Sequence, residues 1–283
     1  MDLCDRKDIQ SLLARHGFHF AKSLGQNFLI RGDVAEAIAD AGCIPGCGVL
    51  EVGPGIGALT VQLAQRAEKV VSVELDKRLP PVLAETMAGY GNFTLIEGDV
   101  MKLSLAEVAA EQFQGLEPVL CANLPYNITT PFLTECVRAG CFRQLTVLIQ
   151  KEVAQRICAR PGTGEYGAFT VLMQYYTEPE LLFEVPNTCF MPPPKVTSAV
   201  VRCVTRRERP VRVVSEEAFW RTVRAGFALR RKTLVNSLQT GWQLPKERLA
   251  GIVESCGLPP TVRGEALGLE EYARLADALA AAE

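Results

Sequence analysis

Val49-Leu50-Glu51-Val52-Gly53-Pro54-Gly55-Ile56-Gly57-Ala58 is the stretch that decides the fold of this chain. Its apolar run ends at a glycine, which predicts a buried strand over residues 49–53. Apolar residues at helical spacing follow over residues 58–67. A strand, a glycine-rich turn and a helix in this order predict one β-α unit of a parallel sheet.

Further β-α units follow along the chain. Short apolar runs predict strands over residues 70–74, 93–96, 118–122 and 145–149. A helix is expected over residues 77–87. We therefore expect an α/β fold in which helices cover both faces of a parallel sheet. Two more strands, over residues 181–185 and 199–204, flank a proline-rich loop and are expected to close the sheet as an antiparallel pair.

The pattern changes after Thr205. Residues 206–210 form a polar linker broken by proline, and the chain is expected to be helical from Ser215 onward. Helix breaks are expected near Gly241, Pro245 and residues 257–260. We predict an α/β domain over residues 1–205 and a small all-α domain over residues 206–283.

The composition describes an ordinary globular protein of 283 residues, with 48% hydrophobic and 22% charged residues. No apolar run approaches the roughly 18 residues that a membrane span needs. Residues 1–6 lack the apolar core of a signal peptide and are too acidic for a transit peptide. We therefore expect a cytoplasmic protein without a membrane partner.

Metal binding is not expected. The 10 cysteines are scattered, and the 2 histidines are His16 and His19. No cysteine pair has the Cys-x-x-Cys spacing of a zinc site, although Cys43 and Cys47 are close in sequence. We expect most cysteines to be small buried residues in a reducing compartment.

Charge is unevenly distributed along the chain. Residues 202–232 carry ten lysines or arginines and three glutamates, a local charge of +7 in a chain whose net charge is −2. Such segregation favours a basic surface for a polyanion on an otherwise acidic body. A solvated helix face is the alternative.

The glycine-rich turn indicates a ligand site. Gly53 and Gly55 allow a ligand close to the backbone, and Glu74 can accept hydrogen bonds from both hydroxyls of a ribose. The Gly-x-Gly-x-x-Ala pattern fits a nicotinamide dinucleotide as well as S-adenosylmethionine. The glycines by themselves also fit a plain tight turn.

Two further strand ends favour S-adenosylmethionine. Asp99 ends the third strand, where its side chain can bind an adenine amine, and Asn123-Leu124-Pro125-Tyr126 ends the fourth. The carboxyl ends of parallel strands meet at one edge of a sheet, so these motifs are expected to gather there. A nicotinamide enzyme has no evident need for Asn-Leu-Pro-Tyr.

Asn123-Leu124-Pro125-Tyr126 suits methyl transfer to the exocyclic amine of adenine. That amine is a poor nucleophile because its lone pair is delocalised into the ring. The Asn123 side-chain oxygen and the Leu124 carbonyl can each accept one N6–H, and they bind more strongly as the amine becomes acidic in the transition state. Pro125 stiffens the turn, and Tyr126 can stack on the base. A strand-ending turn with Tyr126 in the core is the alternative.

The chain resembles the ribosomal RNA adenine N6,N6-dimethyltransferase family over nearly its full length, and most of all the bacterial small-subunit (16S) rRNA enzymes. Asn-Leu-Pro-Tyr together with Phe-x-Pro-Pro-Pro-Lys-Val is the most specific part of the match. The matching segments are residues 24–29, 51–57, 74–76, 98–99, 122–127, 150–153, 190–200 and 230–238.

The resemblance implies a Rossmann-like class I methyltransferase sheet with S-adenosylmethionine as its cofactor. It implies two methyl groups on N6 of each of two adjacent adenines near the 3′ end of small-subunit rRNA. The expected partner is this rRNA in an immature 30S subunit, bound by a monomer. Gln26, Asn27 and Leu29 are implied to close over the methionine part of the cofactor. The expected cofactor-binding residues are Gln26, Asn27, Leu29, Gly53, Gly55, Glu74, Leu75, Asp99, Val100 and Asn123.

The three prolines that follow Phe190-Met191 predict a stiff, extended loop. Phe190 is expected to form the second wall of a base slot opposite Tyr126, because a flipped base is held between aromatic or apolar side chains. A rigid connection between strands with Phe190 buried is the alternative. The expected catalytic residues are Asn123, Leu124, Pro125, Tyr126 and Phe190.

Arg230, Arg231 and Lys232 are expected to begin a helical stretch and to contact phosphate, which positions RNA without reading its sequence. Arg221 and Arg224 are weaker candidates, and a solvated face is the alternative for each residue. The family often has Tyr-Gly-Arg-Leu-Ser where this chain has Tyr-Gly-Ala-Phe-Thr, over residues 166–170. One RNA contact of the family therefore lacks its arginine here.

Three other functions stay open from the sequence. The resistance methyltransferases that modify large-subunit rRNA usually have isoleucine where this chain has Leu124. An RNA-binding assembly checkpoint with secondary catalysis would still bind immature ribosomal particles after its cofactor site is mutated. An NAD oxidoreductase is the third, and titration with both cofactors separates it.

Overall fold

A computed structural model describes residues 1–20 and 26–283. The described chain forms two compact units. The first consists of Met1–Ala154 and Glu178–Thr205, and the second of Gln155–Thr177 and Arg206–Glu283. The described residues include no helix that is both long enough and apolar enough to span a membrane.

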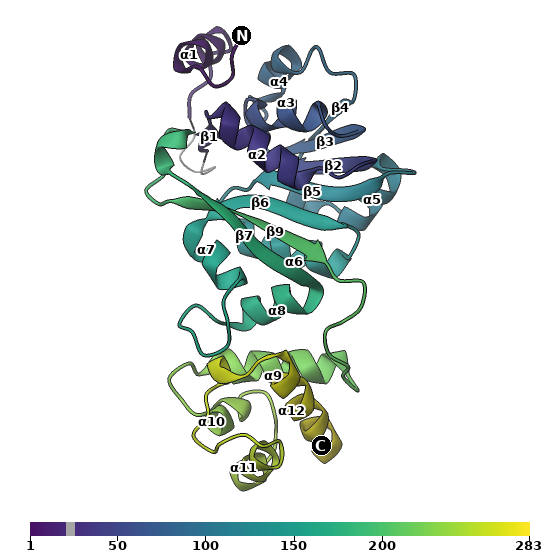
Figure 1. Cartoon of the computed structure of the whole chain (residues 1–283), viewed down its shortest axis with the longest axis vertical. Helices are drawn as coiled ribbons and strands as arrows, with labels where there is room; N and C mark the ends of the chain where they lie inside the picture. The colour runs from purple at the N-terminus through teal and green to yellow at the C-terminus, as the bar shows by residue number, and fades with distance from the viewer. Residues whose placement is uncertain (21–25) are drawn as a thin grey trace. The chain divides into compact units, whose positions relative to one another are not determined.

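A seven-stranded sheet forms the centre of the first unit, in the order β4-β3-β2-β5-β6-β9-β7 (Figure 1). The strands are β2 (Cys47–Val52), β3 (Lys69–Glu74), β4 (Phe93–Glu97), β5 (Glu117–Asn123), β6 (Gln144–Gln150), β7 (Thr177–Val185) and β9 (Ser198–Thr205). Neighbours from β4 to β6 run parallel, whereas β9 pairs antiparallel with β6. The predicted α/β sheet, closed by a late antiparallel strand, is confirmed.

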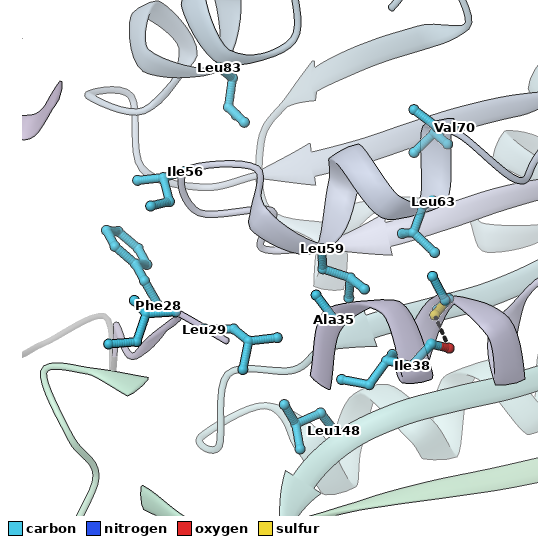
Figure 2. Close-up of a cluster of buried hydrophobic side chains, with 14 of the residues drawn as sticks. Phe28, Leu29, Ala35, Ile38, Ile56, Leu59, Leu63, Val70, Leu83 and Leu148 are labelled. Atoms are coloured by element: carbon cyan, nitrogen blue, oxygen red, sulfur yellow. Dashed lines mark hydrogen bonds between the residues drawn. The ribbon is translucent and has the colours of Figure 1, made fainter. Parts of the chain in front are cut away.

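Side chains that alternate along the strands pack against helices on the two faces of the sheet. One face carries α2 (Gly32–Gly42), α3 (Ala58–Ala64) and α4 (Pro80–Thr86), and α1 (Arg6–Arg15) lies outside this layer, where Arg15 bonds Glu85 of α4. Figure 2 shows part of this core, in which Ile38, Leu59 and Leu63 from the helices meet Val70 and Leu148 from the strands. The helices α5 (Leu105–Gln112) and α6 (Thr129–Ala139) cover the other face (Figure 1).

A second, two-stranded sheet was not predicted. It pairs β1 (Phe28–Leu29) with β8 (Phe190–Met191) in antiparallel register, with Leu29 opposite Phe190. Strands of two residues carry no periodicity that a sequence could show. This small sheet joins the N-terminal motif to the proline-rich loop.

The second unit is helical. Its elements are the end of α7 (Lys151–Ile157), from Gln155 onward, then α8 (Ala168–Tyr176), α9 (Glu216–Ala228), α10 (Leu234–Leu238), α11 (Lys246–Ser255) and α12 (Leu269–Ala282). Three short 3-10 helices complete the described chain: Val100–Lys102, Asn187–Cys189 and Gly264–Ala266. Ser215 caps α9 by accepting a hydrogen bond from the Ala218 N–H (3.2 Å).

Residues 155–177 belong to the helical unit, although the sequence placed them with the sheet. The reason is aromatic packing, because the Tyr175 ring stacks on Phe219 of α9 with a centroid separation of 5.1 Å. The Tyr175 hydroxyl also donates to Glu216 (2.9 Å). A sequence that is read element by element does not reveal such a long-range partner.

Arg230, Arg231 and Lys232 do not begin a helix, as the sequence had suggested. They lie in the turn between α9 and α10, and α10 begins only at Leu234 with Thr233 as its N-cap. The Thr233 side chain makes no cap hydrogen bond, and the helix begins instead at the buried Leu234, whose N–H donates to the Val262 oxygen (2.7 Å).

Candidate active site

A cavity opens at the carboxyl ends of the parallel strands and includes every residue predicted to bind the cofactor. The space between its walls, counted together with the open solvent at its mouth, is about 1080 Å³. Leu24 and Gly25 of the N-terminal motif lie outside the described residues. The predicted residues that line the cavity are Gln26, Asn27, Leu29, Gly53, Gly55, Glu74, Leu75, Asp99, Val100, Asn123, Leu124, Pro125 and Tyr126.

The floor of the cavity is the glycine-rich turn between β2 and α3. Gly53 and Gly55 have φ values of +68° and +60°, a region that L side chains rarely adopt. A Cβ on Gly55 would lie 2.9 Å from the ring of Phe28, which is closer than van der Waals contact allows. Phe28 of β1 therefore packs directly against Gly55, and only glycine fits at residue 55. The other side of the turn faces the cavity.

Glu74 ends β3 and is almost fully buried, with 7% of its surface exposed. Its Oε1 accepts a hydrogen bond from the Asp76 N–H (2.7 Å). Burial raises the pKa of the Glu74 carboxyl to about 7. A buried carboxylate at this place can accept hydrogen bonds from the two hydroxyls of a ribose, which would replace the lost water.

Glu51 is a cavity-lining residue that the sequence reasoning did not single out. It is 1% exposed, and its Oε2 accepts hydrogen bonds from Thr60 Oγ1 (2.8 Å) and Ser72 Oγ (2.7 Å). Burial raises the pKa of the Glu51 carboxyl to about 7. The available signal was a carboxylate in an otherwise apolar buried strand.

Asn123 is the last residue of β5 and lines the cavity. Its Nδ2 donates to the backbone oxygen of Asn27 (3.3 Å). The nitrogen end of the amide is therefore directed at Asn27, and Oδ1 is the end that can accept a hydrogen bond from a ligand.

The turn after Asn123 is fixed from both sides. The Leu124 N–H donates to the Leu148 oxygen on β6 (3.1 Å). The Pro125 oxygen accepts from the Ile128 N–H (3.2 Å) and from Thr129 Oγ1 (3.1 Å). These bonds hold the peptide groups of Asn-Leu-Pro-Tyr in one conformation before any substrate binds.

Tyr126 lines the cavity and forms a hydrogen bond through its hydroxyl to Ser198 Oγ (2.7 Å). Ser198 is fully buried at the start of β9, opposite Gln150 at the end of β6, so the tyrosine ring is held from the same edge of the sheet as the cavity. Ser198 belongs to the matching segment 190–200, but no role had been assigned to it from the sequence.

Phe190 is placed differently from what the base-slot hypothesis needs. It is fully buried in β8, opposite Leu29, and among the described residues it is not part of the cavity wall. This agrees with the alternative of a rigid connection. The part of Phe190 as a wall of a base slot stays a prediction.

The residues predicted to bind RNA fall into two groups. Arg221 is occupied within the protein: it donates to both carboxylate oxygens of Glu283 (2.8 and 2.9 Å) and to the Gly241 oxygen (2.5 Å), and it stacks on Trp242. Arg224 and the residues of the turn over 230–232 are exposed. The Arg230 side chain also donates to the Gly164 oxygen.

Neither a metal centre nor a disulfide is found in the described part of the chain. No group of three or more histidine, cysteine, aspartate or glutamate residues there could hold a metal ion. All ten cysteines are free thiols, and five of them are buried.

The fold and the cavity define a class I methyltransferase: a seven-stranded sheet with a late antiparallel strand and a pocket lined by a glycine-rich turn at its carboxyl edge. Residues 17–280 match the sequence profile of the family described as "Ribosomal RNA adenine dimethylase". This chain belongs to that family.

Curated bacterial relatives match over almost the whole chain. One is "Ribosomal RNA small subunit methyltransferase A" of Geobacillus thermodenitrificans, which is 48% identical over 278 residues, covering 95% of this chain and 94% of the relative. A protein of the same name from Bacillus cereus is 46% identical over 284 residues, covering 98% and 97%.

Solved structures share the fold. The 23S rRNA methyltransferase ErmE superposes with a TM-score of 0.68 at 28% identity, covering 90% of this chain and 100% of that one. A dimethyladenosine transferase from Plasmodium falciparum gives a TM-score of 0.72 at 24% identity, covering 88% and 95%.

Proposed function

We propose that this protein transfers methyl groups from S-adenosylmethionine to N6 of two adjacent adenines near the 3′ end of small-subunit rRNA, two methyl groups to each. The observation that carries the proposal is the orientation of Asn123, whose Oδ1 is the acceptor end of an amide at the wall of the cavity. The small-subunit relatives, at 46% and 48% identity, support the choice of substrate.

The cavity residues fit this cofactor. Glu74 would accept hydrogen bonds from the ribose hydroxyls, and Asp99 would accept one from the adenine amine of the cofactor. The backbone of Gly53 and Gly55, which lines the cavity, would contact the ligand, and Gln26 would hold its methionine part. S-adenosylmethionine supplies an electrophilic methyl group on its sulfonium.

The chain's own residues then prepare the acceptor nitrogen. Asn123 Oδ1 and the Leu124 carbonyl would each accept an N6–H and direct the nitrogen lone pair at the methyl group. The new N–C bond forms as the C–S bond breaks and its electron pair stays on sulfur. The surplus amine proton leaves to solvent, so no catalytic histidine is needed.

RNA binding is assigned to the exposed basic turn over residues 230–232, with Arg224 as a further contact. These side chains would neutralise phosphates and position the immature 30S subunit without reading its sequence. Arg221 has its charge paired with Glu283, so we assign it to the stability of the helical unit instead.

The experiment that tests the function is methyl transfer from labelled S-adenosylmethionine to small ribosomal subunits that lack the modification, followed by mapping of the labelled adenines. Label in two adjacent adenines near the 3′ end of small-subunit rRNA is the expected result. Large subunits serve as the matched control, because ErmE is a 23S rRNA methyltransferase with the same fold. Label confined to large-subunit rRNA would refute the proposed substrate.

A further inference from the structure

Arg78 is a charged side chain beside the cavity that the proposed reaction does not use. It lies in the turn between β3 and α4, and its side chain is 45% exposed. Among the described residues, the cavity wall takes Glu74, Leu75 and Leu79 from this turn but not Arg78. Any contribution of Arg78 to the site is therefore indirect.

On one side, Arg78 holds a buried carboxylate. Its Nε donates to Asp76 Oδ1 (2.8 Å) and its Nη2 to Asp76 Oδ2 (2.6 Å), a two-pronged contact. The Asp76 side chain is only 5% exposed. Its Oδ2 accepts a further hydrogen bond from Gln26 Nε2 (2.7 Å). Asp76 thus lies between Arg78 and a residue of the cavity wall.

On the other side, Arg78 holds the segment before the N-terminal motif. Its Nη1 donates to the His19 backbone oxygen (2.9 Å), and its guanidinium carbon lies 4.8 Å from the centre of the Phe18 ring. Phe18 is buried and lies 5.8 Å from the ring of Phe28. Phe28 in turn lines the cavity next to Gly55.

We propose that Arg78 is a positioning residue for cofactor binding, which holds Gln26 at the cavity wall through Asp76 while it fixes Phe18 and His19 behind the wall. The inference rests on the proposed function. It also explains the residue type. One guanidinium supplies a planar fork for the carboxylate, a third N–H for the carbonyl and a flat face for the ring, which a lysine ammonium does not.

Calorimetric titration of the full chain with S-adenosylmethionine tests this inference. Arg78→Met is expected to raise the Kd about tenfold, because it removes charge-assisted hydrogen bonds that orient Gln26. Arg78→Lys keeps the charge and is expected to restore part of the affinity. In methyl transfer, the KM for the cofactor should rise while kcat at saturating cofactor stays unchanged, since Arg78 contacts no reacting atom. The matched control is Arg66→Met, which breaks an ion pair with Asp40 elsewhere in the unit and should leave the Kd unchanged.

A double-mutant cycle separates positioning from general stability. If Arg78 acts through Gln26, then adding Gln26→Ala to Arg78→Met costs little further affinity. Fully additive losses, or a Kd of Arg78→Met equal to that of the unmutated protein, would overturn the inference. Should Arg78→Met fail to show a cooperative thermal transition, Arg78→Lys and Asp76→Asn replace it, and unchanged Kd values in both would also overturn it. If the unmutated protein itself binds no S-adenosylmethionine, the proposed function fails rather than this inference alone.

Discussion

The cavity of the first unit and the basic turn of the second unit are built in opposite ways. At the cavity, the carboxylates of Glu51 and Glu74 are buried and hydrogen-bonded within the protein, Glu51 to Thr60 and Ser72. In the turn over residues 230–232, the side chains are exposed. The difference teaches that the cavity depends on single atoms in fixed positions, whereas the turn depends on the sum of its charges. We therefore expect single substitutions to act strongly in the first and only in combination in the second.

The largest effect is expected from Asn123→Ala. The substitution removes the amide oxygen proposed to accept the N6–H, so methyl transfer should fall by about 10³-fold, the upper end of the range for loss of one hydrogen-bonding group that stabilises a transition state. RNA binding should be nearly unchanged, because the phosphate contacts are assigned to the other unit. Labelled-methyl transfer and filter binding of the same preparation measure the two quantities. As a matched control, Asn236→Ala removes an amide that bonds Thr233 in the helical unit and should leave transfer intact.

The triple replacement of Arg230, Arg231 and Lys232 by glutamine should weaken RNA binding about 30-fold at moderate salt. The plot of log affinity against log salt should also become flatter, by about one unit for each phosphate that the protein no longer neutralises. Cofactor affinity should not change. An unaltered salt slope would remove this turn from the RNA interface.

Arg221→Met is the control that sharpens this comparison. It lies in the same basic segment, but its guanidinium already bonds Glu283 and Gly241. We expect a loss of about 1–2 kcal/mol in the free energy of unfolding, since these bonds are broken. RNA affinity and its salt slope should stay those of the unmutated protein.

The ends of the strands could be predicted from the sequence because each has a signal in the neighbouring residues. An apolar run followed by glycine or by Asn-Leu-Pro-Tyr gives both the strand and the place where it stops. Parallel strands then bring these ends to one edge, which is where the structure has Gly53, Glu74, Asp99 and Asn123. The contacts that hold the site could not be predicted, because they join distant segments, such as Gln26 with Asp76.

The basic segment was harder to interpret for the same physical reason. Charge counts do not show which arginines are already paired, and the partner of Arg221 is Glu283, 62 residues further along the chain. Likewise, the small sheet of β1 and β8 depends on Leu29 meeting Phe190. Local patterns thus predict elements and their ends, but not the long-range pairs.

A pH titration tests the buried carboxylate of the cavity. The pKa of Glu74 is raised to about 7 by burial, and the ionised form is the one that can accept from both ribose hydroxyls. Cofactor affinity should therefore weaken as pH falls below 7, approaching about tenfold per pH unit. Glu74→Gln should bind more weakly at pH 8 and show a flatter dependence on pH.

The stability of the unliganded protein should depend on pH in the opposite direction to the cofactor affinity. Glu51 and Glu74 have folded pKa values of about 7, above the ordinary value of 4.5, so the folded state binds more protons than the unfolded state between these limits. The free energy of unfolding should therefore rise as pH falls from 7 towards 4.5. Urea unfolding without cofactor at pH 7.5 and 6 measures this contribution. In the binding experiment, an affinity for the cofactor that increases as the pH falls would contradict the proposed role of Glu74 in binding the ribose.

The smallest effect is expected from Ser198→Ala, which leaves the Tyr126 ring in place and removes only the partner of its hydroxyl. If the ring stacks on the target base, loosening it should raise the KM for RNA a few-fold and leave the Kd of S-adenosylmethionine unchanged, because one neutral hydrogen bond contributes about 1 kcal/mol. Tyr126→Phe removes the other half of the same bond and keeps the ring, so it should give a similar change, and the double variant should be no worse than either single one. A loss of cofactor affinity in Ser198→Ala would instead show that this bond supports cofactor binding. Tyr126 would then belong, like Glu74, to the residues that bind the cofactor.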